Sequence, residues 1–439
     1  EMLLRFDEES GPRETFRALG IRQTESNRYI HRSAEPNIQR KADTLHIIKS
    51  LRRRTDVRYA QPNYIRKALV MPNDPQYPRQ WHYPLINLPQ SWDVTTGSNT
   101  VIVAVIDTGV LLNHPDLENR LTSDGYDFIS DPARALDGDG IDPDPDDPGD
   151  GDQGRSSFHG THVSGIIAAE TDNAIGVAGV TWSARIMPLR ALGLGGGTDF
   201  DILQAVRYAA GLDNDAGTLP AQKADIINLS LGGSSFSPAA QDIFTEVSGD
   251  GIIIIAAAGN SASNAPIYPA AYEGVVSVSA VDIEKNLTWY SNFGPTIDLA
   301  APGGDNSADI NADGFPDGVL STCGTDPTGV IEFVYCFFQG TSMAAPHVAG
   351  VVALMKAINP ALTPGELDIL LANGLITEDL GPVGRDDQFG HGLIDAFGAL
   401  VEAQNLAGGG VLPLTLIVNP PALNLGPQST ATLRVEKTG

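Results

Sequence analysis

The sequence predicts an α/β domain with a mostly parallel central sheet, preceded by a small α+β unit. Five apolar runs of strand length lie in the central part of the chain, at 101–107, 184–192, 224–232, 251–259 and 274–281. Runs without polar alternation are typical of strands that are buried on both faces of a parallel sheet. Segments with helical spacing, such as DILQAVRYAAG at 201–211, separate these runs. The alternation of strands with helices indicates a parallel sheet.

The first 69 residues have a different pattern. Short extended segments (MLLRF, SNRYIHRS and DVRYAQPNYI) alternate with helical stretches near 13–19 and 39–54. In the second stretch, Leu45, Ile48 and Leu51 recur at helical spacing. We therefore expect residues 1–69 to form a separate small α+β domain.

Charge separates the same two parts. The chain of 439 residues has a net charge of −26, but residues 1–70 hold 15 of its 28 basic and 9 of its 54 acidic side chains. These residues carry +6, and the remainder carries −32. Opposite charges favour binding between the two parts, whereas the acidic body is a poor partner for nucleic acid. No apolar run approaches the roughly 20 residues of a membrane span, so no span is expected.

The end of the chain predicts a linker and the start of another module. The helical run ALVEAQNL (399–406) is followed by AGGG, a composition typical of flexible linkers. The last residues alternate in polarity and contain Pro-rich turns, but they are too few for a stable domain. We expect residues 408–439 to be a linker and the truncated first strands of a β-sandwich. The α/β domain is then assigned to residues 70–407.

Three short motifs carry an acid, a base and a nucleophile. A serine hydroxyl is a weak nucleophile and needs a base, which in turn needs an orienting acid. Asp107 ends an apolar strand in VAVIDTGV, His159 opens HGTHVSG, and Ser342 lies in GTSMAAPHVAG before a long apolar run. Singly, each residue has a simpler explanation: a turn cap, a structural histidine and a helix N-cap. Because all three occur in glycine-flanked motifs, together they predict a catalytic triad.

These motifs, in the order Asp, His, Ser, resemble the signature segments of the subtilases, the subtilisin-like serine endopeptidases. The resemblance spans roughly residues 73–400. It implies a three-layer subtilisin-like domain in a secreted, monomeric enzyme that hydrolyses peptide bonds of proteins through an acyl-enzyme. It also implies that residues 1–69 are a ferredoxin-like propeptide, which assists folding, inhibits the enzyme and is removed by self-cleavage.

The resemblance assigns roles to individual residues. It implies that Ser342 is the nucleophile, His159 the general base and Asp107 the orienting carboxylate. Asn260, in AAAGN, matches the side-chain donor of the oxyanion hole, and the backbone N–H of Ser342 is expected to be the second donor. Two further motif histidines, His162 and His347, are expected to be structural.

The substrate is expected to bind as an extended strand between two edges of the protein. The resemblance places Gly195, Gly196 and Gly197 on one edge and Ser230, Leu231 and Gly232 on the other. Ile267 matches the floor of the primary specificity pocket, where subtilisin has a glycine. A shallower pocket favours an aliphatic residue before the scissile bond (the P1 residue). We therefore expect propeptide cleavage at Leu69–Val70, with Ala68–Leu69 as the second choice.

Calcium ions are the expected cofactors, although most acidic residues of such a chain form a solvated surface. The resemblance implies a first site from Asp74, Asp116, Thr171, Asn173, Ile175 and Val177, and a second that includes Asp127. A third candidate is DINADGFPDG, with Asp309, Asn311, Asp313, Phe315 and Asp317 at alternate positions and Gly314 at position 6, as in an EF-hand loop. Leu320 replaces the final glutamate of that loop. The insert 124–152 has 11 Asp in 29 residues and remains without assigned ligands.

The two cysteines, Cys323 and Cys336, show neither a Cys-x-x-Cys pair nor a Cys/His metal pattern. They are either two buried thiols or a disulfide, and the extracellular character of the body favours the disulfide. Such a bridge would stabilise the fold by about 3 kcal/mol in the loop-entropy view.

Two other classes of function stay open. A binding module could retain this fold without activity, or the chain could belong to an adhesive surface protein whose activity resides beyond residue 439. The intact set Asp107, His159, Asn260 and Ser342 favours the enzyme.

Overall fold

The protein is described here from a computed structural model. It covers residues 70–151 and 154–410, and it also describes the backbone of four short strands, β1 (Met2–Phe6), β2 (Ile21–Gln23), β3 (Tyr29–His31) and β4 (Val57–Pro62). The chain divides into two compact units, Glu1–Ala68 and Leu69–Gly439. The helices expected near 13–19 and 39–54, Leu69, and the β-strands expected after 410 lie outside the described residues.

The four strands of the first unit form two antiparallel pairs. β1 pairs with β4, from Met2 opposite Pro62 to Phe6 opposite Val57, and β2 pairs with β3. Strands from both ends of this unit therefore lie side by side, as in a small folded domain.

Within the described residues, the second unit contains a nine-stranded sheet in the order β14-β15-β11-β10-β9-β8-β5-β7-β6. The strands are β5 (Ile102–Asp107), β6 (Tyr126–Asp127), β7 (Arg185–Arg190), β8 (Ile226–Leu229), β9 (Ile253–Ala257), β10 (Val275–Val281), β11 (Leu299–Pro302), β14 (Thr377–Glu378) and β15 (Leu393–Ile394). All neighbours pair in parallel except β14 and β15. The mostly parallel sheet predicted from the sequence is thus confirmed.

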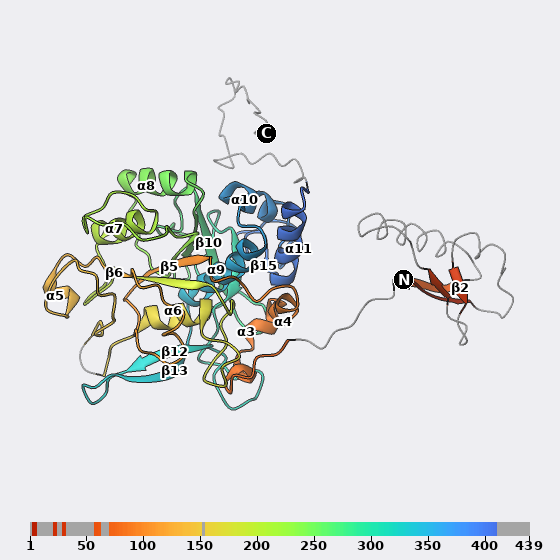
Figure 1. Ribbon diagram of the computed structural model, residues 1–439, viewed down its shortest axis with the longest axis horizontal. Helices are drawn as coiled ribbons and strands as arrows, with labels where there is room; N and C mark the ends of the chain where they lie inside the picture. Colours follow the sequence, from red (N-terminus) through yellow and green to blue (C-terminus); the bar gives the residue numbers. More distant parts are fainter. Residues whose placement is uncertain are drawn as a thin grey trace, which may run out of the picture. The chain divides into compact units, whose positions relative to one another are not determined.

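Helices cover both faces of this sheet (Figure 1). The helices α7 (Asp199–Ala209) and α8 (Pro238–Gly249) pack on one face, and α6 (His159–Ala168), α9 (Thr341–Ile358) and α11 (Ala396–Ala407) pack on the other. The shorter helices are the 3₁₀ turn Tyr77–Arg79, α3 (His82–Leu85), α4 (Leu88–Trp92), α5 (Pro132–Ala135) and α10 (Pro364–Ala372). The result is the expected three-layer arrangement.

Successive residues of β5 point to opposite faces of the sheet, as the geometry of a strand requires. Val103 and Val105 belong to one buried cluster, whereas Ala104 and Ile106 belong to the other. Both faces of the strand are therefore buried, which explains its continuous apolar sequence.

Helix α9 is the long apolar helix at the centre of the domain. It is the one helix in the described part of the chain that is long and apolar enough to cross a membrane, but 83% of it is buried inside the domain. Burial of this kind is what a core helix requires. Pro346 lies inside the helix, and because proline has no N–H it cannot donate to the carbonyl of Ser342.

A two-stranded antiparallel hairpin precedes α9. It consists of β12 (Val319–Thr325) and β13 (Glu332–Phe338), with Ser321 opposite Cys336 and Cys323 opposite Val334. A disulfide joins Cys323 to Cys336, whose Cα atoms are 5.7 Å apart. The expected disulfide is therefore confirmed, and it links the two strands diagonally.

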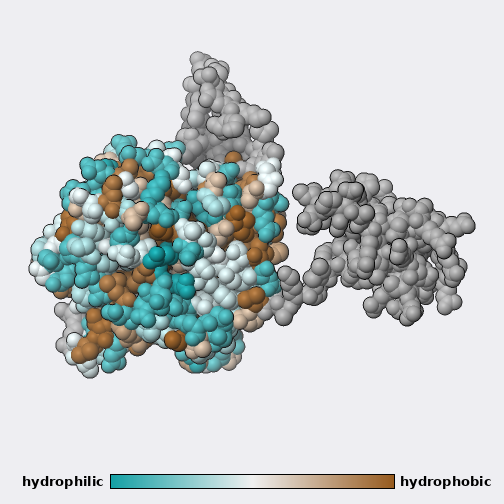
Figure 2. All heavy atoms as spheres, in the orientation of Figure 1, coloured by the Kyte–Doolittle hydropathy of each residue, from teal (hydrophilic) through white to brown (hydrophobic). Residues whose placement is uncertain are grey.

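On the face of the domain that Figure 2 shows, hydrophobic residues lie in separate small groups among hydrophilic ones. Scattered exposed apolar side chains of this kind are usual on soluble proteins.

Candidate active site

Three neighbouring strands end at the same edge of the sheet and bring predicted site residues together. Asp107 is the last residue of β5, Ser230 follows β8, and Asn260 lies three residues beyond β9. β8 pairs with both β5 and β9, so these three positions lie side by side at the carboxyl ends of the strands. Sites in parallel α/β sheets form at such ends.

Asp107 and His159 form a direct hydrogen-bonded pair. His159 is the first residue of α6, and its Nδ1 lies 2.8 Å from Asp107 Oδ1 and 3.0 Å from Oδ2. The Asp107 carboxylate is buried and also accepts from the backbone N–H of Thr108 (2.8 Å), which fixes its plane. Because the carboxylate accepts, Nδ1 carries the hydrogen, and Nε2 of the neutral ring is left as the basic nitrogen.

Electrostatics favour the protonated form of this histidine. Burial is the largest effect and lowers the pKa of His159, but Asp107, through its charge and its hydrogen bond, together with Asp150 and Asp147, raises the pKa above its ordinary value. The pair is therefore suited to accept a proton and to stabilise the cation that results.

Ser342 is the second residue of α9, whose N-cap is Gly340, so Ser342 does not cap the helix. Its helix packs against α6, which begins at His159. In this structure the Ser342 hydroxyl donates to the carbonyl oxygen of Ser230 (3.1 Å), and no hydrogen bond joins it to His159 among the described residues. The hydroxyl must rotate away from Ser230 before His159 can take its proton.

The side chain of Asn260 is held in one orientation. Its Oδ1 accepts from the backbone N–H of Thr341 (2.8 Å) and from the Thr341 hydroxyl (2.9 Å). The Nδ2 group is then left as a donor, and a Cβ atom on Gly340 would lie only 3.4 Å from it. The amide therefore donates beside the start of α9, where the nucleophile lies.

A pocket of about 450 Å³ connects the two predicted substrate edges. Its lining includes Gly195, Gly196 and Gly197 from one edge and Leu231 and Gly232 from the other. Gly195 and Gly196 are exposed and adopt positive φ angles of 78° and 93°, which a residue with a Cβ rarely adopts.

Ile267 lies between two glycines of neighbouring segments. Its Cγ2 would be 2.5 Å from a Cβ on Gly232, and its Cγ1 would be 3.0 Å from a Cβ on Gly259. The side chain therefore occupies the space between the loop after β8 and the loop after β9. Ile267 is not part of the lining of the 450 Å³ pocket, so its role as the floor of the P1 pocket stays a prediction.

The other motif histidines are fully buried. His162 Nε2 lies 3.1 Å from the carbonyl oxygen of Val319 and 3.0 Å from that of Cys336, and His347 Nδ1 lies 2.7 Å from that of Met343. Burial lowers the pKa of His162 to about 3 and that of His347 to about 4, so both rings are neutral. These contacts suit the structural role that we expected for them.

The first predicted calcium site is assembled from three parts of the chain. Asp116 accepts from Asn173 Nδ2 (2.8 Å) and from the N–H of Val177 (2.9 Å), and Asp74 accepts from the N–H groups of Asp172 (2.9 Å) and Asn173 (3.3 Å). Thr171 and Ile175 lie in the same loop.

This group fits a hard cation. Asp74 and Asp116 are both buried, and neither has a basic partner within 70–151 and 154–410. Burial raises the pKa of Asp116 to about 6 and that of Asp74 above its ordinary value. Buried carboxylates without a positive partner are costly, and a cation would relieve that cost.

The loop 309–317 also fits a cation. Asp309 accepts from the N–H groups of Asp313 (3.1 Å) and Gly314 (3.2 Å), and Asp313 accepts from that of Phe315 (2.9 Å), so the loop folds around its own carboxylates. Asp317 is 1% exposed, and its Oδ1 has no hydrogen-bond partner. Burial of a carboxylate oxygen without a partner destabilises the folded state unless a cation binds to it.

Asp127 has a different partner from the one implied by the resemblance. Its buried carboxylate forms an ion pair with the guanidinium of Arg190, which is also buried. Asp127 also accepts from the N–H of Ile129 (2.7 Å). Because the guanidinium already supplies the positive charge, we leave Asp127 out of the calcium sites proposed below.

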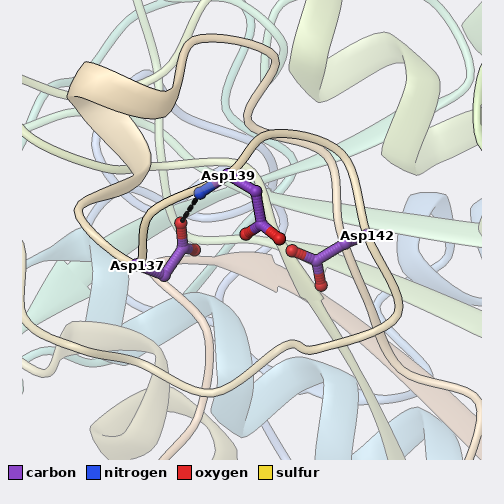
Figure 3. Close-up of side chains that lie close together, drawn as sticks. All are labelled: Asp137, Asp139 and Asp142. Carbon is purple, nitrogen blue, oxygen red and sulfur yellow. Dashed lines mark hydrogen bonds between the residues drawn. The ribbon is translucent and has the colours of Figure 1, made fainter.

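In the acidic insert, one oxygen from each of Asp137, Asp139 and Asp142 lies within 4.8 Å of the others (Figure 3). Asp137 also pairs with Arg190, and Asp139 is exposed. Exposed acidic groups of this kind are common without an ion, so the insert stays unassigned.

The sequence did not indicate two residues that hold the site. Thr341 orients Asn260, and its only signal was its place beside Ser342. Phe158 precedes His159, is fully buried and adopts a positive φ of 48°, which is uncommon for an aromatic residue. Its apolar side chain beside a catalytic motif could have drawn attention to it.

The fold and the Asp–His pair at the carboxyl edge of the sheet define a domain of the subtilisin-like class. Residues 98–392 match the family described as the Subtilase family (Peptidase_S8). The chain therefore belongs to the subtilase family.

Individual relatives agree with this assignment. The chain is 36% identical over 405 residues to "Extracellular protease" of Xanthomonas campestris, an alignment that covers 88% of this chain and 65% of that protein. It is 35% identical to "Thermophilic serine proteinase" of Bacillus sp. strain AK1, covering 81% of this chain and 78% of the other. A solved protease structure from Pseudoalteromonas arctica PAMC 21717 is 39% identical, with a TM-score of 0.69, covering 76% of this chain and all of that one. The chain thus spans about two thirds of the length of the X. campestris protein.

Proposed function

We propose that the protein is a secreted serine endopeptidase that hydrolyses peptide bonds of proteins. The observation that carries the proposal is the hydrogen bond between Asp107 and His159 (2.8 Å), at the sheet edge where Ser342 and the amide of Asn260 also lie. Secretion is supported by the X. campestris relative, whose name calls it extracellular. We expect the enzyme to act as a monomer.

The residues divide the chemistry among them. Ser342 Oγ attacks the scissile carbonyl carbon while His159 Nε2 takes the hydroxyl proton, and Asp107 stabilises the resulting imidazolium. Asn260 Nδ2 and the N–H of Ser342 donate to the oxygen that becomes negative. The proton then passes from His159 to the leaving amine, so that the C–N bond breaks and an acyl-enzyme remains. Water, deprotonated by the same histidine, releases the acid product and restores Ser342.

The substrate binds as an extended strand between residues 195–197 and 230–232. Main-chain hydrogen bonds to both edges give affinity with little sequence preference, so the specificity is broad. Ile267 limits the depth of the P1 pocket because its Cγ2 methyl group lies against Gly232 and its Cγ1 methylene group against Gly259. We therefore propose a preference for aliphatic P1 residues.

Calcium stabilises two loops in this proposal. The first site is formed by Asp74, Asp116 and Asn173 with backbone oxygens of Thr171, Ile175 and Val177. The second is formed by Asp309, Asn311, Asp313, the backbone oxygen of Phe315, and Asp317. The bound ion supplies the positive charge that these carboxylates lack.

The first unit acts as a propeptide and is released by cleavage between Leu69 and Val70. The backbone N of Val70 donates to Asp93 Oδ1 at 3.1 Å. A cut at this bond would turn that N–H into an ammonium group beside a carboxylate, which supports this choice of site.

Labelling with a phosphonylating reagent tests the activity. The purified full chain should react at one residue, Ser342, and lose its ability to degrade an unfolded protein. The matched Ser342→Ala variant should bind calcium and fold alike but show no label and no hydrolysis. Self-cleavage predicts that this variant also retains residues 1–69, which mass spectrometry over time would reveal. A well-folded wild type without label at Ser342 would leave only a binding role for the fold.

A further inference from the structure

We propose that the disulfide-closed hairpin β12–β13 positions the catalytic His159 by clamping the first turn of α6. This inference rests on the proposed function, because it assigns His159 its role as base. None of the contacts that support the proposal involves the imidazole of His159.

The backbone of this first turn is hydrogen-bonded to β12. The Ser321 hydroxyl donates to the carbonyl oxygen of His162 (2.8 Å), and the Thr322 hydroxyl donates to that of Thr161 (2.7 Å). All four residues are buried. These bonds hold the carbonyls two and three residues after His159, so the axis of the turn is fixed against the hairpin.

His162 connects the turn to both strands of the hairpin. Its Nε2 faces the carbonyl oxygens of Val319 on β12 and Cys336 on β13, so Nε2 carries the hydrogen. Its ring stacks on Phe338, with centroids 4.3 Å apart and planes 13° apart. Cys336 is also half of the disulfide, so the bridge fixes one of the two carbonyls that His162 contacts.

Phe158, the residue before His159, also packs against the hairpin. Its ring is fully buried and lies directly over Gly324 of β12: a Cβ on Gly324 would be 2.7 Å from Phe158 Cγ and 2.7 Å from Leu111 Cδ1. The left-handed backbone of Phe158 is a strained conformation for an aromatic residue, and such strain persists only where packing holds it. The hairpin provides this packing, one residue before the catalytic base.

The consequence is geometric. Asp107 is fixed by β5. The first turn of α6 is bound to the residues after β5, through Gly160 N–H to the Thr108 hydroxyl (3.0 Å) and Leu111 N–H to the Thr161 hydroxyl (2.9 Å), and also to the hairpin. A displaced hairpin should therefore shift His159 relative to Asp107. Errors of about 1 Å in such an alignment can lower turnover by roughly 100-fold. Phe158, Thr161 and His162 are therefore positioning residues, not catalytic ones.

Gly324→Ala is the first test, because the added methyl group would collide with the Phe158 ring. On the full chain, with a short chromogenic peptide, we expect kcat to fall between about 10-fold and 100-fold while KM changes less than about twofold. Phe158→Ala removes the ring that packs on Gly324 and should lower kcat on its own. Because both substitutions act on one contact, the double variant should lose less than the two single losses combined. Gly249→Ala, where a Cβ would meet nothing within 4 Å, is the control.

A second readout does not depend on activity. In the inactive Ser342→Ala background, the titration of the His159 ring can be followed by NMR and assigned with His159→Gln. The charged groups that act on this ring are Asp107 on β5 and Asp147 and Asp150 in the loop before α6. Gly324→Ala should lower the ring's pKa, because the contact with Asp107 loosens. If wild type showed no peptidase activity but Gly324→Ala still lowered the pKa of His159, the proposed function would be refuted and the positioning role would stand.

The double variant Cys323→Ala, Cys336→Ala tests the bridge and replaces Gly324→Ala should that variant not fold. We expect the same fall in kcat, the same downward shift in the His159 titration, and a like effect when wild type is treated with a phosphine reductant. An unchanged kcat and an unchanged His159 titration in these variants would overturn the inference. A rise in KM as large as the fall in kcat, without a shift in the His159 titration, would also overturn it.

Discussion

Ser230 and Ser342 exchange hydrogen bonds: the Ser230 hydroxyl donates to the carbonyl oxygen of Ser342 (2.8 Å), and the Ser342 hydroxyl donates to that of Ser230 (3.1 Å). The first bond has a cause in the sequence. In a regular helix the N–H four residues later would satisfy the Ser342 carbonyl, but residue 346 is a proline. Ser230, at the end of β8, supplies the missing donor and ties the start of α9 to the sheet edge.

Ser230→Ala should therefore lower the free energy of unfolding by about 1–2 kcal/mol, because the Ser342 carbonyl and the buried Asn228 amide both lose a partner. Urea unfolding in the Ser342→Ala background, which avoids autolysis, would measure this loss. Pro346→Ala restores an N–H that can reach the same carbonyl, so Ser230→Ala should cost less in that background. Equal costs in the two backgrounds would show that the Ser342 carbonyl is not what Ser230 stabilises.

Asn260→Ala should lower kcat by about 10²–10³ with little change in KM, the loss typical of removing this oxyanion donor from a subtilisin. Thr341→Val removes one of the two donors that orient Asn260 and keeps the backbone N–H, so its loss should be smaller. Steady-state kinetics on one peptide would compare the variants. A larger loss for Thr341→Val than for Asn260→Ala would contradict the orientation argument.

The activity should fall in acid with a midpoint above the ordinary histidine pKa of about 6.5, because His159 must be neutral to accept the serine proton. The sign follows from the site: Asp107 and its acidic neighbours raise the pKa of His159 despite its burial, so protonation begins at higher pH. The acid limb of kcat/KM measures this midpoint. Asp107→Asn should lower it and reduce kcat by about 10⁴. A wild-type midpoint below the ordinary histidine pKa would be inconsistent with this geometry.

The sequence was most informative where local pattern decides the structure. The run 101–107 became β5 (Ile102–Asp107), and 274–281 became β10 (Val275–Val281), because buried parallel strands are continuously apolar. The strand end at Asp107 and the start of α9 also followed from their motifs. These features need no knowledge of distant residues.

Features that depend on distant partners were not accessible from the sequence. Asp127 pairs with Arg190, 63 residues away, and the sequence around Asp127 does not indicate that partner. The hairpin β12–β13 was not predicted beyond its disulfide, because β12 contains small polar residues that pack on α6 and do not read as a strand. The acidic insert has a repetitive composition, so no residue in it stands out as a ligand.

Removing calcium should lower the melting temperature and speed autolysis, because an ion that binds only the native state stabilises it by mass action, by about 2.7 kcal/mol at 100 times its Kd. Thermal unfolding of the Ser342→Ala protein, with excess chelator at fixed ionic strength, separates unfolding from autolysis. Asp116→Ala should remove one part of the chelator effect and Asp313→Ala another. Asp139→Asn, in the exposed acidic cluster, is the matched control and should respond to the chelator as wild type does. An unchanged melting temperature of the Ser342→Ala protein in excess chelator would contradict both sites.

The propeptide cleavage site and the P1 pocket depend on one another. Asp74 accepts from the N–H groups of Asp172 and Asn173, so the mature chain must begin before residue 74 and yet stay close to it. Pro72 is unsuited to follow the scissile bond, because its nitrogen is a secondary amine in a ring. Cleavage at Leu69–Val70 places an aliphatic residue in the pocket and leaves the new amine of Val70 beside Asp93.

Ile267 should set this preference, because its branched side chain fills the space between Gly232 and Gly259. We expect peptides with Leu or Met at P1 to be cut faster than those with Phe, and Ile267→Gly to reverse the order. A difference of a few methylene groups in a pocket changes discrimination by about 1–3 kcal/mol, which kcat/KM ratios on matched peptides would resolve. Ile267→Val, which removes one methylene and keeps the branch, should fall between the two. N-terminal sequencing of the mature protein should begin at Val70 in wild type. A start before residue 60 would contradict the proposed cleavage site. A wild-type preference for Phe would show that Ile267 does not form the floor of the pocket.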